Sequence, residues 1–431
     1  MKLKENSRQG KKLSFGWTAV LTIFGLTLLV TATLAAAQTE TVLHSFKAGK
    51  DGFQPWAGLT FDSSGNLFGT TTAGGFYGVG TAFEFTPKAG GGWTETVLHT
   101  FNNNGRDGYA PLAGLIIDSS GNLFGTTANG GSQGAGTVFE LTPKAGGGYA
   151  EKILHSFLKI TTDGNTPIGG LIIDSAGNLY GTTQNGGRNH YGTVFELSPS
   201  TGGTWTETIL WNFNNANGAN PRAGLVFDSA GNLYGTTEKG GQFNFGAVYE
   251  LSPSSGGTWA EVVSHNFGGI SGDVAYPDAS LIFDSSGNLY GTGSYGGSRG
   301  GGGVFELTVR PSGTSYTVLY FFNDVNGSDG YNSQSPVIFD SAGNLYGTTS
   351  AGGSGTCEQV GVVIGCGAIF KLTPSAGNSW TETLAYSFNF ASTGYVQGPE
   401  SGLISDASGK LYGTTFGGGS LGDGTVFVFK P

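Results

Sequence analysis

Four of the five histidines occupy one recurring position, which makes them the first candidates for chemistry. Around the sequence this position is filled by His44, His99, His155, Trp211, His265, Tyr320 and Tyr386. An imidazole can act as a base or bind a metal ion, but an indole can do neither, so a position that accepts both suits neither role. We therefore expect half-buried rings with a polar tip here, and we predict no metal site and no cofactor.

The fifth histidine, His190, lies outside that position and is the candidate general base, and Glu238 is a further candidate catalytic residue. No Ser-His-Asp order, metal-ligand spacing or phosphate-binding loop accompanies them. A single histidine in a polar loop is usually solvated. We therefore expect no catalysis, and keep an enzyme using His190 or Glu238 as the alternative.

The two cysteines, Cys357 and Cys366, are nine positions apart. In an exported protein an even, closely spaced pair predicts a disulfide that staples a local hairpin. A catalytic thiol is the alternative, and two thiols alone are too few for zinc.

A ten-residue phrase recurs seven times, which predicts a repeat architecture. The phrase reads DSSGNLFGTT in its first copy, and its copies begin at Asp62, Asp118, Asp174, Asp228, Asp284, Asp340 and Asp406. The interval is 54 to 56 residues until the last, which is 66. The Asp-x-x-Gly-Asn step predicts a turn, because one carboxylate per copy is too few for a calcium loop.

Each copy contains four runs rich in β-branched and aromatic residues, bounded by Gly, Pro, Asn or Asp. In the second copy they are 113–118, 122–127, 136–142 and 149–157. Four short strands per repeat are typical of a propeller blade. We therefore predict an all-β, seven-bladed β-propeller of four-stranded blades over residues 38–431, with seven repeats of about 56 residues.

The two ends of the sequence complement each other. Residues 39–46 read as a fourth strand without the first three, and residues 424–431 read as a third strand without a fourth. We predict that the N-terminal strand completes the last blade and closes the ring, which removes two exposed sheet edges.

The repeated D-S-[SA]-G-N-L-[YF]-G-T-T, followed by GG and by G-[TA]-[VA]-[FY]-[EK]-[LF], resembles the GloVer (Gloeo/Verruco) tandem-repeat family of exported bacterial proteins. The resemblance covers the sequence from Thr39 onward. It implies an exported or surface repeat protein, often with an alternative C-terminal anchor, and no particular chemistry. This sequence ends at Lys430-Pro431 without a sorting segment, so we expect release or periplasmic residence.

The first 37 residues read as an export signal. Five basic residues precede a largely apolar stretch from Phe15 to Val30, and Ala35-Ala36-Ala37 gives a small-x-small cleavage pattern. An uncleaved N-terminal membrane anchor is the alternative. We expect a secreted, periplasmic or cell-surface protein.

The net charge limits the classes of binding partner that we expect. The full sequence carries a net charge of −10, and removal of the basic signal makes the remainder more acidic. An acidic chain without a basic run repels phosphate backbones, so we expect neither nucleic acid nor, after cleavage, a membrane as partner.

The loops on one face differ between the copies of the repeat, and we expect the binding residues there. If the transferred strand is outermost, the loops from strand four to strand one and from strand two to strand three share one face. Aromatic residues with adjacent amides and carboxylates are typical of carbohydrate-binding surfaces. The predicted binding residues are Phe53, Tyr109, Tyr191, Phe243, Tyr276 and Tyr331. We expect a non-enzymatic module that binds a glycan or a protein there, with a polysaccharide hydrolase or lyase acting at the channel mouth as the alternative.

Overall fold

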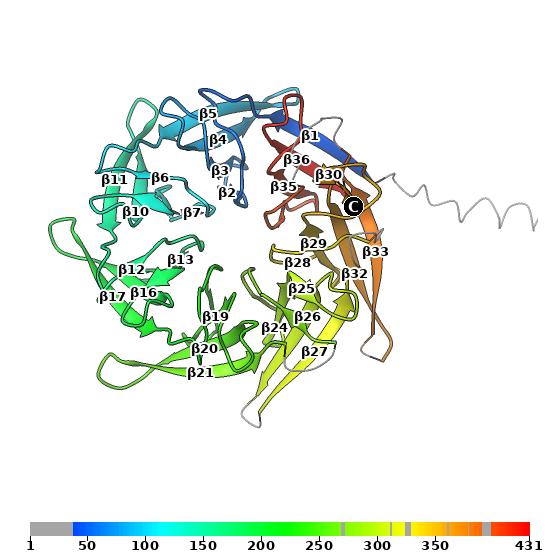
Figure 1. Ribbon diagram of the computed structural model, residues 1–431. Coiled ribbons are helices and arrows are strands. Elements are labelled where there is room, and N and C mark those ends of the chain that lie inside the picture. The colour runs from blue at the N-terminus through cyan, green and yellow to red at the C-terminus, as the bar shows by residue number, and fades with distance from the viewer. Residues whose placement is uncertain are drawn as a thin grey trace, which may run out of the picture. The chain divides into compact units, whose positions relative to one another are not determined.

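The chain folds into seven four-stranded antiparallel sheets arranged as blades around a central axis (Figure 1). The computed structural model describes residues 38–268, 272–310, 313–323, 329–359, 362–377, 379–389 and 398–431. The predicted export signal and its alternative, an uncleaved membrane anchor, both lie within residues 1–37, which are outside the described residues. Among the described residues there is no helix with the length and apolarity needed to span a bilayer.

In each blade the strands run in sequence order from the axis outward, except that the outermost strand of the last blade is the N-terminal one. Blade 1 contains β2 (Thr60–Phe61), β3 (Leu67–Thr71), β4 (Thr81–Pro87) and β5 (Trp93–Thr100). Blade 2 contains β7 (Ile116–Ile117), β8 (Leu123–Thr127), β10 (Thr137–Pro143) and β11 (Tyr149–Ser156). Blade 3 contains β13 (Ile172–Ile173), β14 (Leu179–Thr183), β16 (Thr193–Pro199) and β17 (Trp205–Asn212). Blade 4 contains β18 (Val226–Phe227), β19 (Leu233–Thr237), β20 (Ala247–Pro253) and β21 (Trp259–Asn266).

The last three blades follow the same order. Blade 5 contains β23 (Ile282–Phe283), β24 (Asn288–Gly293), β26 (Gly303–Arg310) and β27 (Gly313–Phe321). Blade 6 contains β28 (Ile338–Phe339), β29 (Leu345–Thr349), β32 (Ala368–Ser375) and β33 (Ser379–Ser387). Blade 7 contains β34 (Ile404–Ser405), β35 (Leu411–Thr415), β36 (Thr425–Lys430) and, outermost, β1 (Thr39–Ser45). The predicted fold is confirmed.

Burial follows position within a blade. All five residues of β8 are buried, because this strand lies between two neighbouring blades, whereas the outer strand β5 alternates exposed and half-buried side chains. Gly125 in β8 faces the ring of Phe139 on β10, and a Cβ at Gly125 would lie 2.6 Å from that ring. The repeated glycine therefore makes room for an aromatic side chain within its own blade.

The N-terminal strand closes the ring as predicted. Strand β1 pairs antiparallel with β36, from Thr39 opposite Lys430 to Ser45 opposite Thr425. The backbone N–H of the next residue, Phe46, donates to the carbonyl of Gly424. The Phe46 side chain is fully buried between blades 7 and 1, with its ring 5.4 Å from that of Phe83.

A ring of threonine hydrogen bonds joins every blade to the next. The first threonine of each Gly-Thr-Thr (Gly-Thr-Gly in blade 5) donates its hydroxyl to a backbone carbonyl of the following blade. The seven pairs are Thr70 to Ala113, Thr126 to Gly169, Thr182 to Ala223, Thr236 to Ala279, Thr292 to Ser335, Thr348 to Ser401 and Thr414 to Ala57. The last pair completes the circle.

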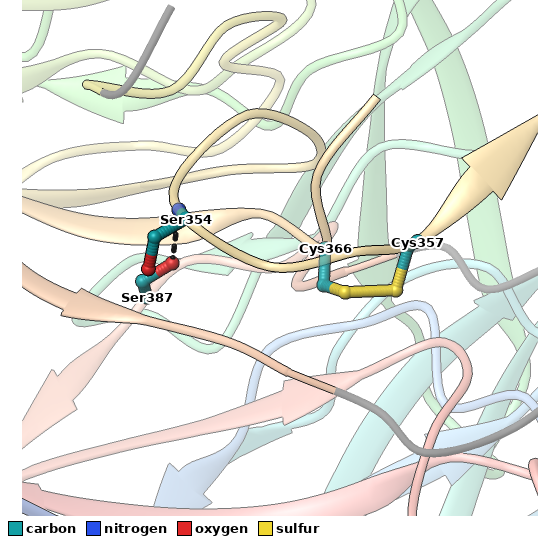
Figure 2. Close-up of a disulfide and its surroundings, with 4 residues drawn as sticks. All are labelled: Ser354, Cys357, Cys366 and Ser387. Atoms are coloured by element: carbon teal, nitrogen blue, oxygen red, sulfur yellow. Dashed lines mark hydrogen bonds between the residues drawn. A yellow bond between two sulfur atoms is a disulfide. The ribbon is translucent and has the colours of Figure 1, made fainter. Parts of the chain in front are cut away.

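The predicted disulfide between Cys357 and Cys366 is present (Figure 2). The Cα atoms of the two cysteines are 5.0 Å apart, and both side chains are buried beside Phe388 and Phe427. The bond closes the insertion that carries β30 (Glu358–Gln359) and β31 (Val362–Val363). It therefore anchors this long loop to the junction between blades 6 and 7.

Ring closure predicts a specific loss of stability. Replacing Phe46→Ala leaves a cavity between blades 7 and 1, and we expect it to lower the free energy of unfolding by about 3–5 kcal/mol. Val42→Ala, on the same strand but 45% exposed, is the matched control and should cost far less. Denaturant unfolding of both variants checks this. Equal midpoints for Phe46→Ala and the unmodified protein would contradict the closure described here.

Candidate functional site at the mouth of the central channel

Two sets of loops hydrogen-bond to each other at one face of the ring. In blade 2, β6 (Gly108–Tyr109) in the entering loop pairs with β9 (Asn129–Gly130) in the loop between the second and third strands. The same pairing joins β12 (Gly164–Asn165) to β15 (Asn185–Gly186), and β22 (Val274–Ala275) to β25 (Tyr295–Gly296). The expectation that both loop sets share one face is confirmed.

In six of the seven blades, the entering loop then passes through a residue in the left-handed region. Positive φ angles of 54° to 67° occur at loop residues, and the set directly before the proline position is Gln54, Ala110, Thr166, Asn220, Tyr276 and Asn332. Ala110 shows what maintains this costly conformation. Its N–H donates to the carbonyl of Val79 in the preceding blade, and its carbonyl accepts from the N–H of Ala128 in its own blade.

The residue that directly follows the proline position in each entering loop faces the central channel. Seven side chains, one from each blade, surround its mouth: Trp56, Leu112, Ile168, Arg222, Asp278, Gln334 and Glu400. The mouth opens into a larger cavity of about 320 Å³ bounded by the innermost strands. Backbone hydrogen bonds hold the residue two positions before each of these seven, and a strand follows each of them, so their backbone positions are well defined.

The ring of seven channel residues divides into two chemically different arcs. Blades 1 to 3 contribute Trp56, Leu112 and Ile168, and blades 4 to 7 contribute the polar members. The Trp56 ring packs edge-on against Phe416, with the ring centroids 5.3 Å apart. One side of the channel mouth therefore offers apolar surface and the other offers hydrogen-bonding and charged groups.

The polar arc holds two carboxyl groups with strongly raised pKa values. Burial raises the pKa of Asp278 to about 7; Arg222 and Lys239 lower it, whereas Glu238 raises it further. Burial also raises the pKa of Glu400 to about 7, with Arg222 opposing this change and Asp278 adding to it. Near neutral pH both carboxyl groups are therefore partly protonated.

Arg222 and its neighbours form a small charge network beside these carboxyl groups. The Nη1 atom of Arg222 lies 3.7 Å from Oε2 of Glu238, and Nζ of Lys239 lies 3.6 Å from the other oxygen of Glu238. Oδ1 of Asp278 is buried and has no hydrogen-bond partner in the described part of the chain. An unpartnered buried acceptor in a channel is available to a ligand.

The six predicted binding aromatics divide into two groups. Tyr191 and Phe243 are exposed, at 39% and 41%. The other four, Phe53, Tyr109, Tyr276 and Tyr331, are half-buried at the base of the entering loops, two or three residues before the channel ring. Tyr276 packs against Phe245 and Tyr295, with ring centroids 5.6 Å and 5.8 Å away.

The two candidate catalytic residues lie in different environments. His190 is exposed in a turn between the second and third strands of blade 3, with a φ of 65°. Glu238 is 15% exposed and pairs with Arg222 and Lys239. No interaction joins the His190 and Glu238 side chains in the described residues, so the geometry does not assemble them as an acid–base pair.

The channel ring was missed by reasoning from motifs, although the repeat contained a signal. The residue after the proline position, which is Ser333 in one copy, differs in every copy, whereas the flanking positions recur. A repeat position that varies completely at a fixed place in a rigid turn is a candidate for specificity. Asp278, Glu400 and Trp56 could have been found in this way.

The repeated aspartates are structural, as predicted. Oδ1 of Asp118 accepts the backbone N–H groups of Ser120 and Asn122, and Oδ2 accepts the Asn122 side-chain amide. Equivalent bonds occur in all seven copies, with Lys410 in place of the asparagine in the last. These carboxylates are already engaged within their own turns.

Because the pKa of Asp278 is raised, we predict that replacing Asp278 raises the free energy of unfolding by an amount that depends on pH. A carboxyl group with a raised folded-state pKa stabilises the fold least above that pKa, so stability is lost as pH rises from about 4 to about 7. We expect Asp278→Asn to stabilise the protein, and the gain to grow by roughly 1–3 kcal/mol between pH 5 and pH 8.

Asp284→Asn is the matched control for this experiment. Burial alone would raise the pKa of Asp284, but hydrogen bonds from Asn288, Ser286 and Tyr290 hold it below its ordinary value. This variant should therefore destabilise the protein at both pH values. Unfolding curves at pH 5 and pH 8 measure both effects, and a pH-independent effect of Asp278→Asn would contradict the prediction.

Comparison with known proteins gives the fold and the family. No curated protein matches the sequence. The extracellular domain of a hybrid two-component system from B. thetaiotaomicron is 11% identical with a TM-score of 0.53, covering 91% of this chain and 39% of that one. An ancestral GH74 enzyme is 12% identical with a TM-score of 0.52, covering 88% and 48%.

This chain thus spans less than half the length of either structure, and the likeness supports the fold alone. The model of the Gloeobacter/Verrucomicrobia repeat matches residues 14–207 and 203–427. Since the two matches cover nearly all of the sequence, the chain belongs to the Gloeobacter/Verrucomicrobia repeat family.

Proposed function

We propose that this protein is an extracytoplasmic binding module that takes the end of a glycan into the mouth of its channel. The observation that carries the proposal is the division of the channel ring into an apolar arc with Trp56 and a polar arc with Arg222, Asp278 and Glu400. The fold repeats seven times, but this ring does not. A site is expected where symmetry is broken, since a ligand is recognised once.

The two arcs match the two kinds of surface on a sugar. The C–H face of a pyranose packs on an aromatic ring, and its hydroxyl groups accept from and donate to charged groups. Arg222 is a donor, and each carboxyl group can accept or, when protonated, donate. The cavity of about 320 Å³ lies at the small end of ligand pockets, which favours one terminal residue over an internal chain segment.

The rim aromatics extend the proposed site outward. Tyr276 lies two residues before Asp278 and contacts the exposed ring of Tyr295. We propose that such rings, with the exposed Tyr191 and Phe243, contact further sugar residues or a protein that carries the glycan. The disulfide supports a location outside the reducing cytoplasm.

Loss of the aromatic platform is the direct test. A glycan-array screen of the protein identifies hits, and Trp56→Ala should weaken binding of those hits by about tenfold or more. Phe76→Ala removes an aromatic that is 72% exposed in a neighbouring loop and serves as the matched control. Equal affinity of the protein and Trp56→Ala for every hit would place the ligand elsewhere.

One observation favours a second candidate, a polysaccharide hydrolase or lyase. Asp278 and Glu400 are two carboxyl groups at one channel mouth with pKa values of about 7, and glycoside hydrolysis uses a protonated and an ionised carboxyl group together. In this second proposal the chemistry lies at the channel ring, and His190 takes no part.

Release of reducing sugar from each bound glycan distinguishes the two functions. Turnover that is lost in Asp278→Asn and Glu400→Gln but retained in His190→Ala would establish the enzyme. Binding without release supports the module.

A further inference from the structure

Three consecutive blade junctions contain the same cluster of one imidazole and two carboxyl groups. A histidine on the outer strand of one blade, an aspartate in the connecting loop and a glutamate on the outer strand of the next blade converge. These junction clusters are His44–Asp51–Glu95, His99–Asp107–Glu151 and His155–Asp163–Glu207. Within each cluster the three possible ligand atoms lie within 4.8 Å of one another.

The spacing of these atoms is that of ligands around a cation. Nε2 of His155 is 3.6 Å from Oδ2 of Asp163 and 3.7 Å from Oε2 of Glu207. Nε2 of His44 is likewise 3.4 Å from Oδ2 of Asp51 and 3.5 Å from Oε2 of Glu95. These four separations exceed a good hydrogen bond, whereas in the remaining cluster Nε2 of His99 lies 3.1 Å from Oδ2 of Asp107, within hydrogen-bond distance. Ligands about 2.1 Å from a zinc ion at tetrahedral to trigonal angles are about 3.4 to 3.6 Å apart.

Buried atoms without partners point to the same conclusion. Among the described residues, Nε2 of His155, Oδ1 of Asp163 and Oε1 of Glu207 are all buried without a hydrogen-bond partner. The Asp163 side chain is only 5% exposed. Two carboxyl groups and an imidazole that share a half-buried site need a cation or a proton between them.

Where one or two members of the cluster are replaced, a side-chain hydrogen bond is present. At the junction of blades 3 and 4 the residues are Trp211, Asn217 and Glu261, and Nδ2 of Asn217 donates to Glu261 at 2.9 Å. At the junction of blades 5 and 6, the hydroxyl of Tyr320 donates to Asp329 at 2.5 Å. The exchange of histidine for tryptophan or tyrosine therefore does not argue against metal binding at the junctions that keep all three ligands.

We propose that the three junction clusters each bind a divalent transition-metal ion of the zinc type, bridging neighbouring blades. One nitrogen and two oxygen ligands suit Zn²⁺ better than Ca²⁺ or Mg²⁺, which prefer oxygen alone. Because the histidine and glutamate side chains remain 14–21% exposed, water can complete the coordination. One of the three ions joins His44 on the closing strand to Glu95 of blade 1, so the metal fastens the seam of the ring.

Zinc stoichiometry tests the proposal. Metal-stripped full-length protein is titrated with ZnCl₂ by calorimetry, and bound zinc is counted by mass spectrometry after desalting. We expect three equivalents, a rise in the unfolding midpoint on zinc addition, and two equivalents for Glu207→Gln. Glu261→Gln at the blade 3–4 junction is the matched control and should keep three, as should His190→Ala, which removes the remaining histidine outside the repeated position.

The variants are chosen so that folding does not obscure the result. Glutamine keeps the size of glutamate and can hydrogen-bond to the aspartate, and circular dichroism confirms that each variant is folded. Should Glu207→Gln fail to fold, His155→Gln replaces it with the same expected loss of one equivalent. Absence of tightly bound zinc, or equal zinc content in Glu207→Gln and Glu261→Gln, would overturn the proposal and leave the clusters as proton-shared contacts between blades.

Discussion

The hydrogen bond from a threonine hydroxyl to a backbone carbonyl of the next blade is the contact on which the arrangement depends. It recurs at all seven junctions, and the last, from Thr414 to Ala57, joins the two ends of the propeller. The accepting residue directly follows a member of the channel ring: Ala113 follows Leu112, and Ala279 follows Asp278. The contact that spaces the blades therefore also sets the positions of the groups at the channel mouth.

This arrangement separates scaffold from site. Threonine, glycine and aspartate recur because each makes a backbone-directed contact that the geometry of every blade requires, as Asp118 does in its turn. The residues of the channel ring make no such recurring contact, because their side chains project into the channel. Seven positions can therefore vary independently without disturbing the fold, which permits an apolar arc opposite an acidic one.

Neighbouring blades are joined by different contacts at the outer edge of the ring and at its inner edge. Near the axis, uncharged hydroxyl-to-carbonyl bonds join the blades. At the periphery, ionisable or aromatic side chains join them, and His265 stacks on Tyr316 at 3.8 Å where other junctions have a glutamate. Exchange of whole sets of side chains at this position shows that the junction accommodates several chemistries.

The sequence by itself determined the architecture. A phrase repeated seven times, four strand-like runs per copy and complementary ends predict the number of blades, their strands and the closure of the ring, and the cysteine pair predicts the disulfide. These features are local or periodic, so they can be recognised in the sequence without knowledge of the fold. The grouping of the channel ring and of the junction clusters is harder to read in this way, because neighbouring channel residues lie more than 50 residues apart and each cluster combines residues of two blades, with the glutamate 44 residues beyond the aspartate. Only the tertiary structure brings Arg222, Asp278 and Glu400 to one channel mouth, since closing the ring places equivalent positions of different repeats side by side.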